Sequence, residues 1–298
     1  MIGYFILLHR FPEQFKRMFH AIYAPGNSYV IHVDKGSGPE FAADIAAFLK
    51  PFQGVAIIES KKALWGGYSL VDAELRGMEK LLKMNRSWTH YINLSGQDFP
   101  LKSQTYIRAF LRANPRRQYI RALDQRAVRP DTLNRVSHMF VEALGRMFRT
   151  RLPRAFLKGA TPYIGTQWKA VTRSFCQFAV HNPSAERFKT FYRRSFIPDE
   201  AFFQTLMMNS RAQGEVMNDD LRTIDWVPDG DIKLRPRIFV TADALRLTLS
   251  LDLFARKFDA GEDEGIFDLL EAHLKTPAAN VYAGDPAPRP PMPARENA

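Results

Sequence analysis

The sequence predicts an α/β protein with a mostly parallel central sheet flanked by helices. In the first 111 residues, four short apolar runs alternate with four segments of helical periodicity, and the connections are short. This alternation is typical of parallel strands joined by right-handed helical crossovers. The chain has 298 residues, 46% of them hydrophobic and 12% aromatic, which is enough to bury a substantial core.

The four apolar runs and the four helical segments follow one another in order along the chain. The predicted strands are residues 4–8, 29–34, 55–58 and 90–94. The predicted helices are residues 15–22, 41–49, 69–84 and 103–111, with apolar side chains spaced by three and four. The first strand is apolar throughout, as a central parallel strand requires, and Ser103 is a good N-cap for the fourth helix.

The middle of the chain, residues 112–173, is strongly basic, and the formal net charge of the protein is +11. This charge favours anionic partners. Within the segment, the apolar spacing from Met139 to Phe148 predicts an amphipathic helix. Such a helix either lies on an anionic membrane or packs on the core with a solvated polar face. No helix-turn-helix, zinc-finger or RNA-binding motif is present, so we expect no nucleic-acid partner.

The last third of the chain is expected to complete the same domain. We predict strands at residues 167–172 and 221–226 and helices at residues 242–251 and 262–274. Residues 277–298 are rich in Pro and Ala and are expected to be a disordered tail, so the domain spans residues 1–276. The single cysteine, Cys176, permits no intramolecular disulfide, and the apolar start is too short for a membrane span. We therefore expect a cytoplasmic protein, with peripheral membrane contact as an option.

Polar residues follow the predicted strands at the edge where parallel sheets bind ligands. They are His9 and Arg10, Asp34, residues 60–67 and residues 95–98. Their polar side chains and glycines suit a nucleotide pocket. Neither a Gly-x-Gly-x-x-Gly dinucleotide motif nor a P-loop is present.

A carboxylate candidate for general-base chemistry is Glu200. Pro198 suits the first turn of a helix, and Asp199 and Glu200 would lie at the positive end of its dipole. A carboxylate held on a rigid element can accept a proton in catalysis. An acid at this position can equally serve only to complement the helix dipole, and the local sequence leaves both interpretations open.

Cations gather late in the chain, where a phosphate could bind. They are Arg222, Lys233, Arg235, Arg237, Arg256 and Lys257. Lys257 lies between Phe254 and Phe258, which indicates a partly buried ammonium that needs an anion. The anion is either a ligand diphosphate or a carboxylate of the chain, such as Asp252 or Asp259.

A metal site is not expected. The fourth strand is followed by a single carboxylate, Asp98. Asp229 and Asp231 have the spacing of an Asp-x-Asp metal motif, but they lie in a Pro- and Gly-containing turn, where Asp is common. No paired His or Cys has zinc-ligand spacing.

Short motifs in a fixed order carry a resemblance to one family. They are YFILLH (4–9), AIYAP (21–25) with YVIHVD (29–34), LWGGYS (64–69), YINLSGQDFPLK (91–102), GTQW (165–168), PDE (198–200) and LFARKFD (253–259). Together they resemble the core-2/I-branching β-1,6-N-acetylglucosaminyltransferases and the related peptide O-xylosyltransferases. The Trp-Gly-Gly form leans toward the xylosyltransferases.

The resemblance implies a GT-A type glycosyltransferase that inverts the anomeric centre without a metal or another cofactor. It implies UDP-N-acetylglucosamine or UDP-xylose as donor and a glycan, polysaccharide or protein hydroxyl as acceptor. The residue roles that it implies are these: Glu200 as general base; Leu8, His9, Asp34 and Trp65 at the nucleotide; Lys257 at the diphosphate, with Arg235 or Arg222 as its partner; and Trp226 near the acceptor. Trp168 is a second aromatic that could stack on a sugar, although core packing is the usual role of a single tryptophan.

The alternative function is a catalytically inactive, basic carbohydrate- or nucleic-acid-binding module that keeps the fold.

Overall fold

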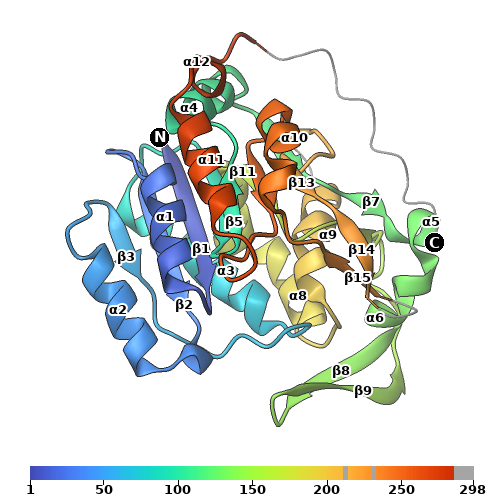
Figure 1. Ribbon diagram of the computed structural model, residues 1–298. Helices are drawn as coiled ribbons and strands as arrows, with labels where there is room; N and C mark the ends of the chain where they lie inside the picture. The colour runs from blue at the N-terminus through green and yellow to red at the C-terminus, as the bar shows by residue number, and fades with distance from the viewer. Residues whose placement is uncertain (211–213, 230–232, 285–298) are drawn as a thin grey trace.

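The computed structural model describes residues 1–210, 214–229 and 233–284 (Figure 1). Its centre is a seven-stranded sheet with the order β12-β6-β11-β4-β1-β2-β3. The strands of this sheet are β1 (Ile2–Leu8), β2 (Ser28–Val33), β3 (Val55–Ile57), β4 (His90–Ser95), β6 (Arg117–Ile120), β11 (Lys169–Thr172) and β12 (Glu215–Val216). The central, mostly parallel sheet predicted from the sequence is confirmed.

Strand β1 lies in the middle of the parallel half of the sheet. It pairs in parallel with β2, where Leu8 faces Val33, and with β4, where Leu7 faces Ser95. The carboxyl ends of the three strands therefore meet at one edge. Strand β11 is antiparallel to both β4 and β6.

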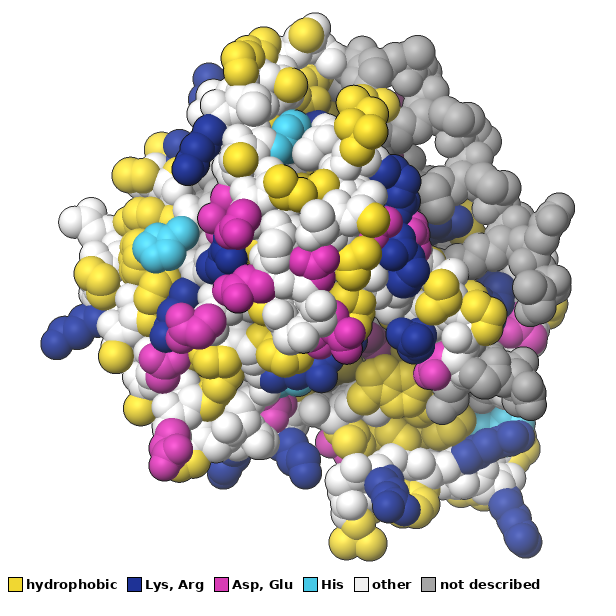
Figure 2. All heavy atoms as spheres, viewed as in Figure 1, with side chains coloured by type: hydrophobic (Ala, Val, Ile, Leu, Met, Phe, Trp, Pro, Cys, Tyr) yellow, Lys and Arg dark blue, Asp and Glu magenta, His cyan; other side chains and the backbone are white. Residues whose placement is uncertain are grey.

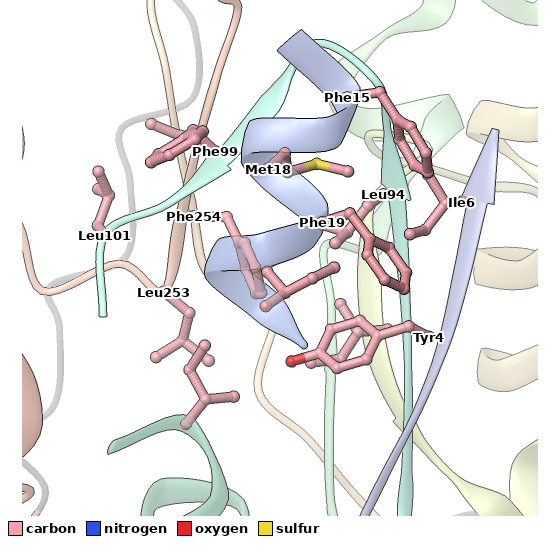
Figure 3. Close-up of a cluster of buried hydrophobic side chains, with 14 of the residues drawn as sticks. Tyr4, Ile6, Phe15, Met18, Phe19, Leu94, Phe99, Leu101, Leu253 and Phe254 are labelled. Carbon is pink, nitrogen blue, oxygen red and sulfur yellow. The ribbon is translucent and has the colours of Figure 1, made fainter. Parts of the chain in front are cut away.

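Helices cover both faces of the sheet, as the alternating sequence pattern predicts. They include α1 (Pro12–Ile22), α2 (Pro39–Leu49), α3 (Ser69–Met84), α4 (Gln104–Ala113), α7 (Arg173–His181), α8 (Pro183–Tyr192), α9 (Phe202–Met208) and α11 (Gly265–Leu274). On one face, Phe15, Met18 and Phe19 of α1 point toward Tyr4 and Ile6 of β1 (Figure 3). Helices α3, α7, α8 and α9 supply the core on the other face, around Phe5.

Further short elements lie outside the seven-stranded sheet. They are β5 (Asp98–Pro100), β7 (Leu123–Asp124), β10 (Tyr163–Ile164), β13 (Arg222–Ile224), β14 (Trp226–Asp229), β15 (Lys233–Pro236), β16 (Phe254–Arg256), α5 (Gln125–Val128), α6 (Asn134–Ser137), α10 (Ala244–Leu249) and the 3₁₀ turns η1 (Lys35–Ser37), η2 (Pro130–Leu133), η3 (Pro198–Glu200) and η4 (Thr241–Asp243). The predicted strand at 221–226 is divided between β13 and β14. Strand β13 joins β16 and β5 in a three-stranded sheet, whereas β14 pairs with β15.

The helix predicted over residues 139–148 is wrong. This segment forms a hairpin of β8 (His138–Ala143) and β9 (Arg146–Pro153), which extends away from the rest of the molecule (Figure 1). Leu144 and Gly145 have φ angles of 49° and 70°, the left-handed backbone that closes a two-residue hairpin turn. An apolar spacing that suits a helix also suits a hairpin once such a turn divides it.

The predicted disordered tail begins too early. Residues 277–284 are described, and α12 (Pro277–Asn280) lies against α4. The Ser103 amide donates to the Ala279 carbonyl at 3.0 Å, and the Tyr282 ring lies 5.5 Å from that of Phe110. The remainder of the predicted tail, residues 285–298, lies outside the described residues. Across the described ranges, no helix is long and apolar enough to span a bilayer.

A buried ion pair connects the sheet to α3. Lys169 of β11 lies 2.7 Å from the Glu74 carboxylate, with the two side chains almost fully buried. The Tyr91 hydroxyl donates to the same carboxylate at 2.9 Å, and the Lys169 ammonium donates to the Gln167 carbonyl at 2.6 Å. The desolvation cost of burying each charge is offset only while both partners are present.

Lys169→Met should therefore lower the free energy of unfolding by about 3–5 kcal/mol, because it leaves Glu74 buried without a counter-charge. Urea unfolding measures the change. Lys83→Met, which removes an exposed pair with Glu79, is the matched control and should cost less than about 1 kcal/mol. Equal effects of the two substitutions would contradict the role given to the buried pair.

Candidate active site

The carboxyl ends of β1 and β2 are joined by Asp34. Its amide donates to the Leu8 carbonyl at 2.7 Å. Its carboxylate accepts from the Gly36 amide at 2.6 Å and from the Ala63 amide at 2.7 Å. Asp34 thus holds the loop at residues 60–67 against the sheet edge. The Leu8 side chain is buried, so Leu8 lines this edge through its backbone.

His9 and Arg10 follow β1 directly. Partial desolvation and then the nearby Arg10 and Arg256 charges lower the pKa of His9 below its ordinary value of 6.5. His9 is therefore mainly neutral at pH 7. Arg10 donates to the Gln97 side chain at 3.0 Å, which ties it to the loop after β4.

Lys257 lies at this edge among other cations. Its neighbour Phe258 exchanges hydrogen bonds with Gln97: the Phe258 amide donates at 3.0 Å, and the Gln97 side chain donates to the Phe258 carbonyl at 3.2 Å. Burial, and then Arg10 and Arg256, lower the pKa of Lys257; Arg235 adds to the effect. We call Arg10, Arg235, Arg256 and Lys257 the basic cluster.

Within the described part of the chain, no carboxylate comes within ion-pair distance of Lys257. Asp259 acts on it only at longer range. Asp252, the other proposed internal partner, accepts instead from the Thr223 hydroxyl at 2.7 Å. The partly buried ammonium therefore lacks a close internal counter-ion, which leaves it available to an anionic ligand.

The structure separates the two arginines that the sequence left as alternatives. Arg222 is buried, with its side chain 1% exposed, 3.8 Å from Asp98 and donating to the Asn93 carbonyl. A group so enclosed has no surface for a phosphate. Arg235 is exposed, 3.9 Å from Asp229, and belongs to the basic cluster. The placement favours Arg235 as the partner of Lys257.

Trp168 is part of the scaffold of the site. It is buried, and the guanidinium groups of Arg222 and Arg256 each lie 4.7 Å from its ring. The structure therefore gives Trp168 a packing role in place of the sugar stacking considered from the sequence. Trp226 is half-buried at the start of β14, opposite Pro236 of β15.

Trp65 lies in the loop that Asp34 holds and is 63% exposed. One edge of its ring meets Phe196 at a centroid distance of 5.8 Å. The Gly66 carbonyl accepts from the Ile197 amide at 2.9 Å, and a side chain on Gly66 would collide with Phe196. This loop therefore contacts the segment that leads directly into Glu200.

Glu200 ends the η3 turn, two residues before the first residue of α9. The predicted helix start is therefore confirmed, and its first turn is a 3₁₀ turn. Its carbonyl accepts from the Gly165 amide at 2.9 Å, and Arg135 donates to Oε2 at 3.0 Å. Oε1 accepts no hydrogen bond from the described residues. The carboxylate is thus anchored through one oxygen and is about one-third exposed.

The sequence did not single out Arg135, and it gave no partner to Asp98, noted after the fourth strand, or to Asp199, noted beside Glu200. Arg135 was one of many arginines in the basic segment, and no local signal identified Glu200 as its partner. Asp98 is fully buried and pairs with Arg256 at 3.0 Å. Asp199 is buried beside Glu200, and its Oδ1 lacks a hydrogen-bond partner. Burial first, and then the Glu200 charge, raise the pKa of Asp199 to about 7.

No cluster of three or more His, Cys, Asp or Glu side chains suited to a metal occurs in the described ranges. Asp231, one half of the Asp-x-Asp spacing, lies outside them, while Asp229 neighbours Arg235.

Comparisons with known proteins agree with the resemblance found in the motifs. The sequence model of the core-2/I-branching enzyme family matches residues 2–245. The chain is 27% identical to xylosyltransferase 2 of Mus musculus over 94% of its own length and 35% of that protein. It is 28% identical to a xylosyltransferase of Ciona intestinalis, over 92% of this chain and 34% of that protein. The chain spans about a third of the length of these curated relatives.

Asp199 should make the protein less stable as the pH rises. The unfolded carboxyl ionises near pH 4 and the folded one near pH 7, so between these values the folded state binds more protons. The stability contributed by this group is complete below pH 4 and is lost by about pH 7. Relative to the wild type, Asp199→Asn should gain on the order of 2–4 kcal/mol in unfolding free energy between pH 4 and 8.

Urea unfolding at each pH measures this difference. Glu262→Gln, which changes an exposed carboxyl, is the control and should follow the wild-type pH profile. If the unfolding free energy of Asp199→Asn varied with pH in parallel with that of the wild type, the raised pKa of Asp199 would be contradicted.

Proposed function

The chain belongs to the core-2/I-branching enzyme family, and we propose that it is an inverting, metal-independent glycosyltransferase with a GT-A type fold. It transfers xylose or N-acetylglucosamine from a UDP-sugar to a hydroxyl of a glycan, polysaccharide or protein acceptor, and the product is β-linked. The names of its xylosyltransferase relatives favour xylose.

The observation that carries the proposal is the position of Lys257. It is partly buried among like charges, without a close carboxylate partner in the described chain, at the edge where β1, β2 and β4 end. Arg256 pairs with Asp98 and Arg235 lies 3.9 Å from Asp229, but Lys257 has no such partner in the described chain. A bound diphosphate would supply the anion that Lys257 lacks and would relieve its repulsion from the neighbouring arginines. Fixed Lys and Arg charges can stabilise a leaving diphosphate in place of a metal ion.

In the proposed reaction Glu200 acts as the general base. Arg135 anchors Oε2, and Oε1 accepts the proton of the acceptor hydroxyl. The hydroxyl oxygen then forms a bond to the anomeric carbon while the bond from that carbon to the diphosphate oxygen breaks. The electron pair leaves with UDP, where Lys257, with Arg10 and Arg235 of the basic cluster, stabilises the developing charge. Attack on the face opposite the leaving group converts an α-linked donor into a β-linked product.

The nucleotide would lie between the strand ends and the loop at residues 60–67. His9 offers a mainly neutral ring, and Trp65 offers an exposed indole for stacking. Asp34 acts chiefly by fixing the loop, since its carboxylate already accepts two backbone amides. Trp226 remains the proposed aromatic on the acceptor side.

Glu200→Gln should lower kcat by about 10²–10⁴-fold, because the amide cannot accept the hydroxyl proton. UDP release from UDP-xylose and UDP-N-acetylglucosamine in the presence of candidate acceptors measures turnover. Glu79→Gln on α3 is the matched control and should retain wild-type activity. Full turnover by Glu200→Gln would exclude this base. Donor binding without any turnover by the wild type would favour the inactive binding module.

Lys257→Ala should reduce turnover roughly 10²–10³-fold by removing a charge from the leaving diphosphate. It should also weaken UDP binding, which titration calorimetry can measure. Lys275→Ala, at an exposed site, controls for the loss of one positive charge. Unchanged UDP affinity in Lys257→Ala would show that this lysine does not contact the diphosphate.

Activity should persist after dialysis against EDTA and should not require added divalent ions. Strict dependence on manganese would contradict the metal-independent mechanism.

A further inference from the structure

The β8–β9 hairpin extends from the body of the protein and exposes large apolar side chains (Figures 1 and 2). Leu144, at the tip, is 96% exposed. Val141, Phe148 and Leu152 are exposed along the strands. Soluble proteins rarely present several large apolar groups on one projecting element unless it contacts a partner.

The two faces of the hairpin differ. Phe140 points to the body, where its ring stacks on Phe196 at 5.2 Å, and the Glu142 carboxylate lies against Gly67. Val141 alternates with these residues and pairs across the strands with Phe148, so this apolar pair occupies the outward face. One face therefore fixes the hairpin on the segment before Glu200, and the other faces solvent.

The tip residue is unfavourable for the turn that it forms. Leu144 and Gly145 occupy the two left-handed positions of the turn, where Asn-Gly or Asp-Gly is preferred. A leucine with φ of 49° carries backbone strain, and its side chain gains nothing from burial. Folding stability does not account for leucine at this position.

The charges beside the apolar groups are nearly all positive. Arg146, which pairs with Ala143, is exposed on the outward face, and the Lys62 ammonium lies near Gly145. Arg149 and Arg151 are also exposed on β9, but Arg149 pairs with Phe140, so alternation places these two on the opposite face. At the hairpin root, Arg154 donates to the Val136 carbonyl at 3.0 Å and the Phe191 carbonyl at 2.9 Å. Glu142, the acid within the hairpin strands, has its carboxylate against the body.

We propose that the β8–β9 hairpin docks the protein on an anionic phospholipid membrane. Leu144 and Phe148 enter the boundary between headgroups and acyl chains, while Arg146, on the same face as Phe148, contacts lipid phosphates. A soluble polyanion would use the exposed arginines but would have no use for an exposed leucine at the tip. The membrane contact considered from the sequence thus involves a hairpin in place of a cationic helix, and it is independent of catalysis.

Vesicle sedimentation with the full chain tests the proposal. The protein should pellet with vesicles of 70% phosphatidylcholine and 30% phosphatidylglycerol and remain in solution with pure phosphatidylcholine. Leu144→Asn improves the turn while removing the apolar tip, so it should weaken binding roughly tenfold without lowering the melting temperature. Arg146→Glu should weaken it by about fivefold or more. Lys80→Glu, a charge reversal at an exposed position on α3, is the matched control and should have little effect.

Insertion itself can be followed at the tip. Leu144→Cys can be labelled selectively with an environment-sensitive fluorophore because the native Cys176 is buried. The emission should shift to the blue on anionic vesicles. Failure to pellet with anionic vesicles would overturn the proposal. Pelleting that responds to Arg146→Glu but not to Leu144→Asn, with no spectral shift, would also overturn it and would indicate adsorption of a general polyanion-binding surface.

Discussion

The buried carboxylate of Asp98 is the contact on which the proposed donor site depends. It accepts from the Ser95 amide at 2.8 Å at the end of β4 and pairs with Arg256 on β16 at 3.0 Å. It also lies 3.8 Å from Arg222 on β13. A single fully buried anion thus joins the central sheet to the small β13–β16–β5 sheet. Removing it would take the nearest carboxylate from the buried Arg222 and the ion-pair partner from Arg256, which is more costly than losing an exposed pair.

This arrangement divides the late cations into two groups with different roles. Arg222 and Arg256 are held by Asp98 and by the Trp168 ring, and so they build the wall of the site. Lys257 follows Arg256 in the chain, and its backbone is held by hydrogen bonds: its amide donates to the Arg237 carbonyl at 3.4 Å, and its carbonyl accepts from the Phe239 amide at 2.9 Å. A cation carried on a fixed backbone without a close counter-ion can stabilise an anion with little reorganisation of the chain, the condition that favours electrostatic catalysis.

The proposed base, Glu200, is positioned by a second set of contacts. Asp34 holds the loop of Trp65, and Gly66 of that loop bonds to Ile197 in the segment before Glu200. The hairpin packs on the same segment through Phe140 and Phe196. The segment before the base therefore contacts both the nucleotide-side loop and the projecting hairpin. Docking of the hairpin on a surface would orient this side of the site toward that surface.

The sequence by itself determined the order of four strands and four helices through residue 111, because each of them follows from local apolar periodicity and a clear break. It missed the short strand β5 (Asp98–Pro100), which pairs with the distant strand β16. It also identified the polar residues at the strand ends, the late group of cations and Glu200 at a helix start as candidate site residues. The apolar spacing of residues 139–148 fits both a helix and a hairpin, and the strained Leu144–Gly145 turn lacks a typical turn sequence, so the hairpin could not be predicted from the local pattern. Only the tertiary structure decided which charges are compensated. The ion pair of Asp98 with Arg256 spans 158 residues and that of Glu200 with Arg135 spans 65, and periodicity carries no information at such separations. The tertiary structure therefore decided that Arg222 and Trp168 lie in the interior and that Lys257 has no close carboxylate among the described residues. Burial and counter-ions depend on distances between side chains that only folding sets.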